Sequence, residues 1–593
     1  MAKQKEKNTA AVTYKANPLF DYALLAAFAI FIILFTTFKI SGDDDVFWHL
    51  ATGKYVMETG HVPSTDIFGY VTQGQEWMPF EWGWDVVTYN IYKAFGYEGL
   101  SVFRTIIFLS IFFIYYLILR KFKVSTTLSV FMFLIIAFGI IDRLTPRPHI
   151  ISLLFFVLLL YLIISFRYFN RKNTYLYFIP VIFLLWANMH MGILAGIFLF
   201  GIYVVSEVIT YFKPSSYSSK EVPALDKKQI TLLAIIFVVS LLVMLINPNG
   251  IATYIYAYSH TKMKLLETIN EWRSPFDSQF GGGFVGNIYK LFLFAGVLVL
   301  YYAFKKKDLF FGLIYLGFMV YSVRAVRFTV DYIIIIAIFL IVALSYILMN
   351  LRNKNISSFI NDKPALKVVI ALILIYFSFN LPNNKLYLDT LQYYRISGFG
   401  INSDFIPTQM FDFMKENKIT EIGEKPFNHF GTGGYLVWNF PNAKNFIDSR
   451  NLNDNIFTEY NSIMSKRPGF EKKLNDYNID YVMYLAPDLV RAPQEMQQTI
   501  ISYLSQKSDE WKLVFWDDKS FLFVRNIPKF KEVVDKYEYK FLTPFNIVYQ
   551  PQSVDKGFKN NLEEFKKEVN RQKAIEPNGA LINSVLNKYQ SKL

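Results

Sequence analysis

Long apolar runs constrain this chain more than any other feature of its sequence. About eleven of them approach the length of roughly 20 residues that a helix needs to cross a bilayer, and hydrophobic residues make up 53% of the chain. The pattern therefore predicts an α-helical polytopic membrane protein. The predicted spans are residues 22–40, 100–119, 127–141, 150–166, 174–187, 192–211, 230–246, 288–304, 309–323, 332–350 and 368–381.

Lysine and arginine in the connecting segments predict the orientation, because short cytoplasmic loops are enriched in both. One alternating set of segments, which starts with the N-terminus, holds 21 basic residues, and the other set holds 9. We therefore expect a cytoplasmic N-terminus, an outer first loop at 41–98 and an outer C-terminal part after about Pro382. The basic cytoplasmic loops account for much of the net charge of +14, so this charge does not indicate a nucleic-acid partner.

The predicted outer loops bring acids, histidines and arginines to one side of the membrane. Asp43, Asp44 and Asp45 follow the first span directly, and carboxylates at such a boundary are typically kept where they bind a cation or take a proton. We expect an extended backbone here, which would turn Asp43 and Asp45 to one face and Asp44 to the other. Two carboxylates so close together repel each other unless a cation or an arginine lies between them.

Each of these loop residues has a simpler interpretation when it is taken alone. Tryptophans form interfacial belts, and arginines at helix ends reach toward lipid headgroups. The clustering on one side is what favours an active site. The other loop residues in this cluster are Trp48, His49, Glu81, Asp142, Arg147, His149, Asn188, His190, Glu271, Arg273, Arg324 and Arg327.

This mixture of side chains suits transfer from a phosphate-linked donor. A carboxylate can act as a general base or hold a divalent cation, and arginines bind phosphate through paired hydrogen bonds. Neither a phosphate-binding Walker loop nor a dinucleotide fingerprint is present in the sequence. A sugar on a polyprenyl phosphate fits instead, with its tail among the spans and its phosphate at the arginines. Since a phosphate leaving group needs little protonation, one base suffices for an inverting displacement.

Five motifs together resemble the GT-C superfamily of membrane glycosyltransferases, which includes protein mannosyltransferases, the aminoarabinose lipid A transferase and the catalytic subunit of oligosaccharyltransferase. They are DDDVFWHLATGKY from residue 43, EW at 81–82, RPH at 147–149, WANMHMG at 186–192 and the Arg-x-x-Arg-Phe at 324–328. The resemblance covers roughly residues 20–525. It implies a catalytic acid at Asp43 or Asp45, which Glu81 joins as a candidate. It also implies a divalent cation, Mg²⁺ or Mn²⁺, with Asp43, Asp45, Asp142 and Glu271 as its ligands.

The chain becomes less apolar after Pro382. Residues 383–528 are predicted to form an extracytoplasmic α/β domain, with strands within 424–451, at 479–485 and at 519–525 and a helical stretch at 494–506. Residues 529–593 are predicted to form a helical or flexible tail, and residues 1–382 the transmembrane domain. The order GGYLVW then FIDSR resembles the acceptor-binding WWDYG region of oligosaccharyltransferases and implicates Tyr435, Trp438, Asp448 and Arg450, together with Gly434. The alternative is that Gly433-Gly434 makes a turn and that Asp448 and Arg450 form an ion pair.

The predicted function is transfer of a sugar or oligosaccharide from a polyprenyl-linked donor to an acceptor on the outer side of a bacterial inner membrane. The acceptor is a protein side chain, which the exterior domain favours, or an envelope glycolipid. Two other readings stay open: a transporter or flippase for a lipid-linked precursor, and a non-catalytic scaffold that binds envelope glycans. The predicted substrate-binding residues are Trp48, His49, Arg147, His149, Asn188, His190, Arg273, Arg324, Arg327, Tyr435, Trp438, Asp448 and Arg450.

Overall fold

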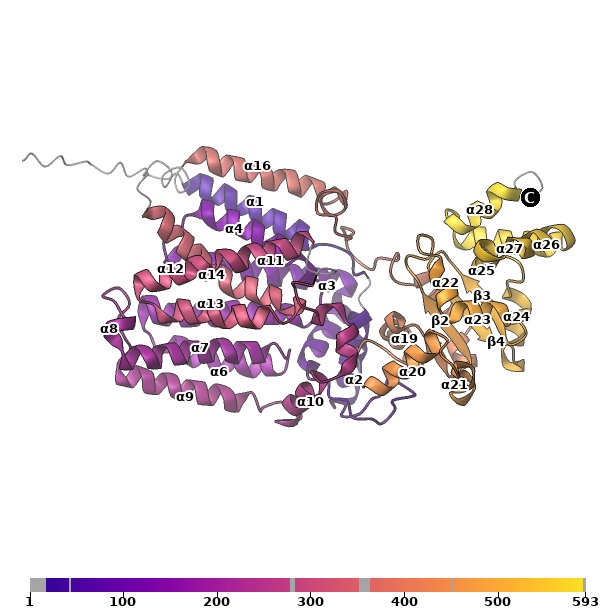
Figure 1. The fold of residues 1–593 in the computed structure, drawn as a ribbon, viewed down its shortest axis with the longest axis horizontal. Coiled ribbons are helices and arrows are strands. Elements are labelled where there is room, and N and C mark those ends of the chain that lie inside the picture. Colours follow the sequence, from indigo (N-terminus) through magenta and orange to yellow (C-terminus); the bar gives the residue numbers. More distant parts are fainter. Residues whose placement is uncertain (1–17, 42–43, 278–282, 351–362, 451–452, 590–593) are drawn as a thin grey trace, which may run out of the picture.

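The structure is a computed structural model that describes residues 18–41, 44–277, 283–350, 363–450 and 453–589. A bundle of roughly parallel and antiparallel helices forms one half, and the C-terminal part, residues 383–589, lies beyond one end of this bundle (Figure 1). The bundle helices are α1 (Pro18–Thr36), α3 (Trp82–Lys121), α4 (Thr126–Gly139), α5 (His149–Ile164), α6 (Thr174–Ala187), α7 (Ile193–Phe212), α9 (Lys227–Val243), α11 (Phe284–Ala295), α12 (Val297–Lys306), α13 (Leu309–Ser322), α14 (Thr329–Met349) and α16 (Pro364–Asn380).

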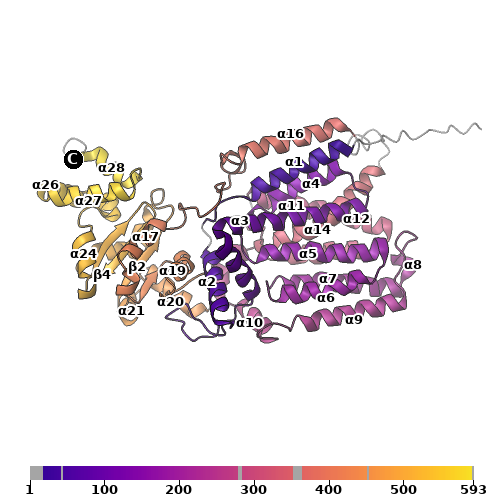
Figure 2. The ribbon, with the colours of Figure 1, turned by 180° about the vertical axis from the view of Figure 1, so that it is seen from behind.

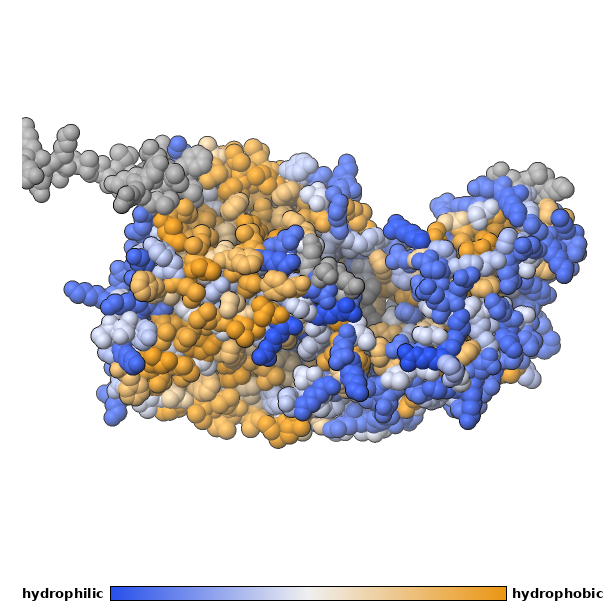
Figure 3. Space-filling view, viewed as in Figure 1, coloured by the Kyte–Doolittle hydropathy of each residue, from blue (hydrophilic) through white to orange (hydrophobic). Residues whose placement is uncertain are grey.

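The bundle has the length and composition of a membrane-spanning unit. Among the described residues, six helical segments are long and apolar enough to cross a bilayer, and four shorter apolar helices accompany them. These ten lie on predicted spans, and α9 lies on the remaining one, 230–246. Large apolar side chains such as Phe113, Phe178 and Phe212 are exposed on the bundle, and Figure 3 shows the hydrophobic surface concentrated there while the C-terminal part is mostly hydrophilic. A multi-pass membrane protein is confirmed, whereas the count of eleven spans stays a prediction.

The segments assigned to the two sides of the membrane lie at opposite ends of the bundle. The short helix α8 (Pro214–Tyr217), from a predicted cytoplasmic loop, lies at the end away from the C-terminal part. At the other end lie α2 (Asp44–Thr59) and α10 (Ala252–His260), from predicted outer loops, and both views place α2 between the bundle and the C-terminal part (Figures 1 and 2). The loops that the basic-residue pattern assigns to opposite sides of the membrane therefore lie at opposite ends of the bundle in these three cases.

The first predicted outer loop is largely helical. Helix α2 packs along the first turns of α3, which begins at Trp82, well before the predicted span at 100–119. Helix α3 is broken at Gly96, where φ is 63°, a left-handed conformation that glycine adopts without the usual steric cost.

Short 3₁₀ turns and a π-helical turn connect the bundle helices. They are η1 (Ile141–Arg143), η2 (Ser165–Asn170), η3 (Lys264–Thr268), η4 (Asn270–Trp272) and η5 (Val326–Phe328). Several bundle helices begin at a capping side chain, as at α9, where the Asp226 carboxylate accepts from Gln229 N at 2.8 Å and the Gln229 amide oxygen accepts from Asp226 N at 3.1 Å.

The C-terminal part is built on a four-stranded sheet of order β1-β2-β4-β3, with β1 parallel to β2 and the other pairs antiparallel. The strands are β1 (Pro426–Asn428), β2 (Tyr481–Leu485), β3 (Trp511–Trp516) and β4 (Ser520–Arg525). The other elements are η6 (Leu386–Thr390), α17 (Thr408–Glu416), α18 (Ile419–Ile422), η7 (Phe430–Thr432), α19 (Gly433–Asn439), α20 (Asp454–Met464), α21 (Phe470–Asp476), α22 (Gln494–Gln498), α23 (Ile500–Gln506), η8 (Pro528–Phe530), α24 (Lys531–Tyr537), α25 (Pro544–Tyr549), α26 (Pro551–Asn560), α27 (Leu562–Ile575) and α28 (Ala580–Tyr589).

Some predictions for this part were right and others were wrong. Strands at 479–485 and 519–525 and the helical stretch at 494–506 are present, as β2, β4 and α22–α23. The prediction of a strand at the end of 424–451 was wrong, since Phe446 and Asp448 lie in irregular backbone, and β3 was missed. Helices α25–α28 bury Phe545, Phe565 and Ile582 in the same core cluster as the sheet residue Phe523.

Candidate functional site

A cavity of about 380 Å³ lies where the bundle meets the C-terminal part. Its lining comes from α2, from the segment before α3, from the loops that connect the bundle helices at this end and from the C-terminal part. The lining residues are Asp45, Trp48, His49, Trp77, Met78, Pro79, Phe80, Glu81, Arg143, Arg147, Pro148, His149, His190, Tyr256, His260, Ile269, Glu271, Trp272, Arg327, Phe430, Ser449 and Arg450.

Helix α2 supplies three of these residues from a single face. Asp45, Trp48 and His49 are spaced three and four residues apart, which places them together on a helix. The prediction of an extended backbone was wrong for the described residues, because α2 begins at Asp44. Asp43 lies outside the described residues. Asp45 lies in the first turn of α2, and the helix directs its side chain into the cavity.

Arginines bind the carboxylates at the cavity. Arg147 Nη2 lies 3.1 Å from Asp45 Oδ2, and Arg147 Nη1 lies 3.8 Å from Glu271 Oε1. Arg143 donates to both oxygens of Glu271, at 3.3 and 2.9 Å. Burial alone would raise the pKa of Glu271, but Arg143, Arg147 and Arg327 together lower it to about 2. The Arg147 guanidinium therefore lies between the carboxylates of Asp45 and Glu271, and its positive charge offsets the repulsion between them.

The remaining oxygen of Asp45 is also occupied. Trp48 Nε1 donates to Asp45 Oδ1 at 3.3 Å, and the Ser449 hydroxyl donates to the same oxygen. On the far side of the cavity, the Arg327 guanidinium lies over the Trp272 ring at 4.4 Å from its centroid. A backbone hydrogen bond of 2.8 Å from Val326 N to Arg273 O fixes these two loops together.

The fit of a divalent cation can be judged from these contacts. Of the predicted ligands, Asp43 lies outside the described residues, and Asp142 is exposed and is not among the described residues that line the cavity. Asp45 and Glu271 use their oxygens on guanidinium, indole and hydroxyl groups. Within the part of the chain that the structure describes, no group of three or more His, Cys, Asp or Glu side chains is arranged to hold a metal ion. The described residues therefore do not fit Mg²⁺ or Mn²⁺.

Glu81 lies between two imidazoles. Its Oε2 is 3.7 Å from His49 Nε2, and its Oε1 is 3.6 Å from His190 Nε2. Burial, with a smaller contribution from Asp45, raises the pKa of Glu81 to about 8. Burial also lowers the pKa of His190 to about 3 and holds that of His49 well below its usual value. At neutral pH both imidazoles are therefore uncharged, and Glu81 is mostly protonated.

Close packing of α2 on α3 brings His49 to its second partner. A Cβ on Gly53 would lie 2.1 Å from the Asp85 carbonyl oxygen, so only glycine allows the two helices to approach this closely. His49, one turn before Gly53, is hydrogen-bonded through Nδ1 to Asp85 Oδ1 at 2.6 Å. Both His49 and Asp85 are buried.

Comparisons with known proteins find other structures with a similar fold. No protein-family model and no curated protein sequence matches the chain. Among solved structures, the Archaeoglobus fulgidus oligosaccharyltransferase in its apo form is 14% identical, with a TM-score of 0.53 over 87% of this chain and 75% of that chain. The archaeal oligosaccharyltransferase AglB from the same organism, in complex with an inhibitory peptide and a dolichol-phosphate, is 13% identical, with a TM-score of 0.52 over 86% of this chain and 75% of that chain.

The protein shares the fold of these archaeal oligosaccharyltransferases. ArnT from Cupriavidus metallidurans bound to undecaprenyl phosphate is also similar, at 12% identity and a TM-score of 0.47 over 86% of this chain and 98% of that chain. At such identities the likeness concerns the fold, and the roles of individual residues have to be argued from the site itself.

Other predicted residues lie near the cavity without lining it. The Asn188 amide oxygen accepts from Trp82 Nε1 at 3.0 Å, and its backbone oxygen accepts from Gly83 N at 2.9 Å, so Asn188 fixes the start of α3. Arg324 is exposed, and Arg273 is not among the described residues at the cavity. His149, by contrast, lines the cavity and contacts Arg143 O through Nε2 at 2.8 Å.

The residues carried over from the WWDYG-like segment have different positions. Tyr435 is buried, with its ring 4.7 Å from that of Phe47. Trp438 donates from Nε1 to the Tyr97 hydroxyl at 3.0 Å. Neither is among the described residues at the cavity. Both side chains join the C-terminal part to α2 and α3, so their positions indicate docking between the two halves.

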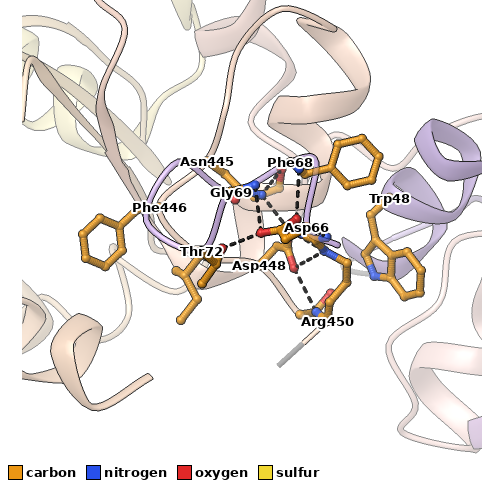
Figure 4. A network of polar contacts seen from close by, with 12 residues as sticks. Trp48, Asp66, Phe68, Gly69, Thr72, Asn445, Phe446, Asp448 and Arg450 are labelled. Atoms are coloured by element: carbon orange, nitrogen blue, oxygen red, sulfur yellow. Dashed lines mark hydrogen bonds and ion pairs between the residues drawn. The ribbon is translucent and has the colours of Figure 1, made fainter. Parts of the chain in front are cut away.

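Arg450 and Asp448 form a buried ion-pair network with the first loop (Figure 4). Arg450 Nη2 lies 2.7 Å from Asp448 Oδ2, and Arg450 Nη1 lies 2.7 Å from Asp66 Oδ1. Thr72 and the backbone N–H groups of Phe68 and Gly69 also donate to Asp66. The ion-pair alternative from the sequence therefore describes these residues, although Arg450 also reaches the cavity lining.

Several lining residues were missed from the sequence. Arg143 lies within the DRLTPRPH segment, and Trp272 lies within NEWRSP, next to residues that were singled out. A rule that takes every Arg and Trp of the short outer loops would have found both. Ser449 and Phe430 carry no such signal, because their position depends on how the C-terminal part docks on the bundle.

Proposed function

We propose that this protein transfers a sugar or oligosaccharide from a polyprenyl-linked phosphate or pyrophosphate to an acceptor on the extracytoplasmic side of the membrane, with inversion at the sugar. The observation that carries this proposal is the convergence of Arg143, Arg147 and Arg327 on one cavity that also holds the protonatable Glu81. Guanidinium groups bind phosphate oxygens in pairs and stabilise the charge that develops on a leaving phosphate.

The apolar surface beside the cavity suits a polyprenyl tail. Helix α10 contributes Tyr256 and His260 to the cavity, and two neighbouring apolar side chains, Ile251 just before the helix and Ile255 within it, are 60% and 63% exposed. An isoprenoid chain that contacted these apolar side chains would have its phosphate beside the cavity that holds the arginines. AglB, which has the same fold, is described in complex with a dolichol-phosphate.

A polypeptide acceptor is favoured over a glycolipid because the C-terminal part shares the cavity. Phe430, Ser449 and Arg450 close it on the side away from the bundle, so an extended chain held by the C-terminal part would reach the donor there. The complex of AglB contains a peptide as well as the lipid.

The direct test uses proteoliposomes that contain the purified protein and a polyprenyl-phosphate donor with a labelled sugar. We expect label to move to a peptide acceptor, and the anomeric configuration of the product to be inverted. Transfer only to an added glycolipid would correct the acceptor. If label reached neither acceptor while the donor crossed the bilayer, the protein would be a flippase.

Removal of divalent cations is expected to leave transfer nearly unchanged, within about twofold, because guanidinium groups already neutralise Asp45 and Glu271. The measurement is the initial transfer rate after chelation, with and without added Mg²⁺ or Mn²⁺. A loss of activity that either ion restored would show that the site takes a cation despite these ion pairs.

The orientation can be mapped with single cysteines, since the chain has none of its own. A cysteine at the exposed Ser508 is expected to react with an impermeant reagent in intact cells, and one at the exposed Ser215 only after lysis. Ser462 is unsuitable because it is buried. The reverse labelling pattern would place the cavity in the cytoplasm and overturn the proposed side of transfer.

A further inference from the structure

The imidazoles beside Glu81 belong to a continuous line of polar contacts that runs from α3 to α6. It starts at the buried Asp85 carboxylate, passes through the cavity and ends at a buried indole. Its members, in order, are Asp85, His49, Glu81, His190, Ser152 and Trp186, and the successive contacts measure 2.6, 3.7, 3.6, 2.7 and 2.7 Å.

The far end of this line fixes the tautomer of His190. Trp186 Nε1 can only donate, so Ser152 Oγ accepts from it and directs its own hydrogen to His190 Nδ1. Gly192 N also donates to His190 Nδ1, at 3.0 Å. Since Nδ1 accepts twice and the imidazole is neutral, its hydrogen lies on Nε2 and is directed at Glu81 Oε1.

At the other end of the line, the protons of Asp85, His49 and Glu81 can be arranged in two ways that have the same total charge. In the first, Asp85 is ionised, His49 carries its hydrogen on Nδ1, and the Glu81 carboxyl donates to His49 Nε2. In the second, the Glu81 proton has moved to His49 Nε2, and the Nδ1 proton has moved to Asp85. His49 is uncharged in both arrangements, as its lowered pKa requires. Asp85 Oδ2 is buried and has no hydrogen-bond partner among the described residues, and burial raises the pKa of Asp85, so this carboxylate can take the proton from His49 in the second arrangement.

We propose, on the basis of the function proposed above, that Glu81 is the base that takes the acceptor proton and that His49 and Asp85 position it and hold its resting proton during the reaction. Glu81 transfers its proton to His49, which passes one on to Asp85. The free carboxylate then takes a proton from the acceptor as the acceptor atom bonds to the anomeric carbon. The bond from that carbon to the phosphate oxygen breaks, the phosphate leaves as an anion at the arginines, and the surplus proton returns to water.

Asp45 suits the role of base less well. Its two oxygens already receive Arg147, Trp48 and Ser449, so a proton from the acceptor would have to displace one of these contacts. Among the described carboxylates at the cavity, Glu81 is the one whose contacts are imidazoles. The distances from Glu81 to these imidazoles exceed a hydrogen bond here, and such contacts commonly shorten when substrate binds.

The relay predicts a specific change in pH dependence. In the wild type, internal transfer frees the Glu81 carboxylate, so the turnover rate is expected to be nearly flat between about pH 6 and 8. In His49→Gln, Glu81 has to lose its proton to water. The rate at neutral pH is then expected to fall about tenfold, because only about a tenth of Glu81 is ionised there, and to rise with pH by up to about tenfold per unit until the Glu81 pKa of about 8, with the KM for the donor little changed. Glu81→Gln should abolish transfer at every pH, and His61→Gln, at an exposed site on the same loop, should behave as wild type.

Three charged groups, in addition to the neutral imidazoles, face Glu81 and have to stay in place in these variants. Asp45 raises its pKa, whereas Arg327 and Arg147 lower it. A rate that fell equally at all pH values in His49→Gln would show a merely structural role for His49, and an unchanged profile would overturn the relay.

An infrared titration separates this proposal from the proposed function. In the purified protein, a protonated-carboxyl band that Glu81→Gln removes is expected at neutral pH and should disappear near pH 8; His49→Gln should change its frequency. Absence of the band overturns the relay even if sugar is transferred. The band together with a failure to transfer sugar to any acceptor supports the relay and refutes the proposed function.

Discussion

Replacement of Arg147 by alanine is expected to lower the transfer rate by about 100-fold or more, the scale observed when one preorganised charged donor is removed from a developing negative charge. Arg147 is the guanidinium that contacts both Asp45 and Glu271 at the cavity, and in the proposed function it meets the donor phosphate. The initial rate of label transfer in proteoliposomes measures the effect. Arg147→Lys should also be impaired, because an ammonium group cannot form the paired hydrogen bonds of a guanidinium.

The matched control for this prediction is Arg324→Ala. Arg324 is in the neighbouring RAVRF motif but is exposed and is not among the described residues that line the cavity, so we expect wild-type rates. Thermal unfolding in detergent has to accompany both variants, because loss of Arg147 removes two ion pairs. Full activity in Arg147→Ala, with the fold intact, would mean that this arginine only anchors the loop.

Replacement of Arg450 by methionine is expected to destabilise the contact between the C-terminal part and the first loop by about 3–5 kcal/mol, the usual cost of removing one partner from a buried ion pair. Asp66 and Asp448 would remain buried with unbalanced charge, since the side chains of all three residues are at most 2% exposed. The measurement is a lowered midpoint of thermal unfolding in detergent, with faster proteolytic cleavage in the loop at 60–80.

Two further variants separate the effect of burial from the loss of charge. Lys531→Met breaks an ion pair on an exposed helical surface and should change stability by less than about 0.5 kcal/mol. In the Arg450→Met background, Asp66→Asn together with Asp448→Asn should restore part of the lost stability. If Arg450→Met unfolds at the wild-type temperature, the network does not hold the two halves together.

The sequence predicts the parts of this protein whose signals are local. Apolar runs predict the positions of the bundle helices, and the basic loops separate its two ends, because both signals depend on neighbouring residues. The same reasoning identifies Asp45, His49, Glu81 and Arg147, since acids and imidazoles in membrane loops are uncommon without a purpose.

Contacts between residues that are far apart in the sequence cannot be predicted from these local patterns. Nothing local indicates that Arg147 lies between Asp45 and Glu271, or that Arg450 reaches Asp66 across 384 positions of sequence. The helical start of α2 was also missed, because a run of three aspartates is a poor helix former when considered alone. Packing at Gly53 and the hydrogen bond from Ser449 to Asp45 determine that geometry.

Arg450 belongs both to the network that joins the two halves and to the wall of the cavity. A molecule that contacts this wall interacts with the docked arrangement and loses contacts when the halves separate. Its binding free energy and the docking free energy are therefore thermodynamically coupled, and the coupling is reciprocal: each factor by which docking strengthens binding is also a factor by which the bound molecule strengthens docking. The coupling can therefore be measured in two ways, as a change in ligand affinity when docking is weakened or as a change in docking stability when the ligand binds.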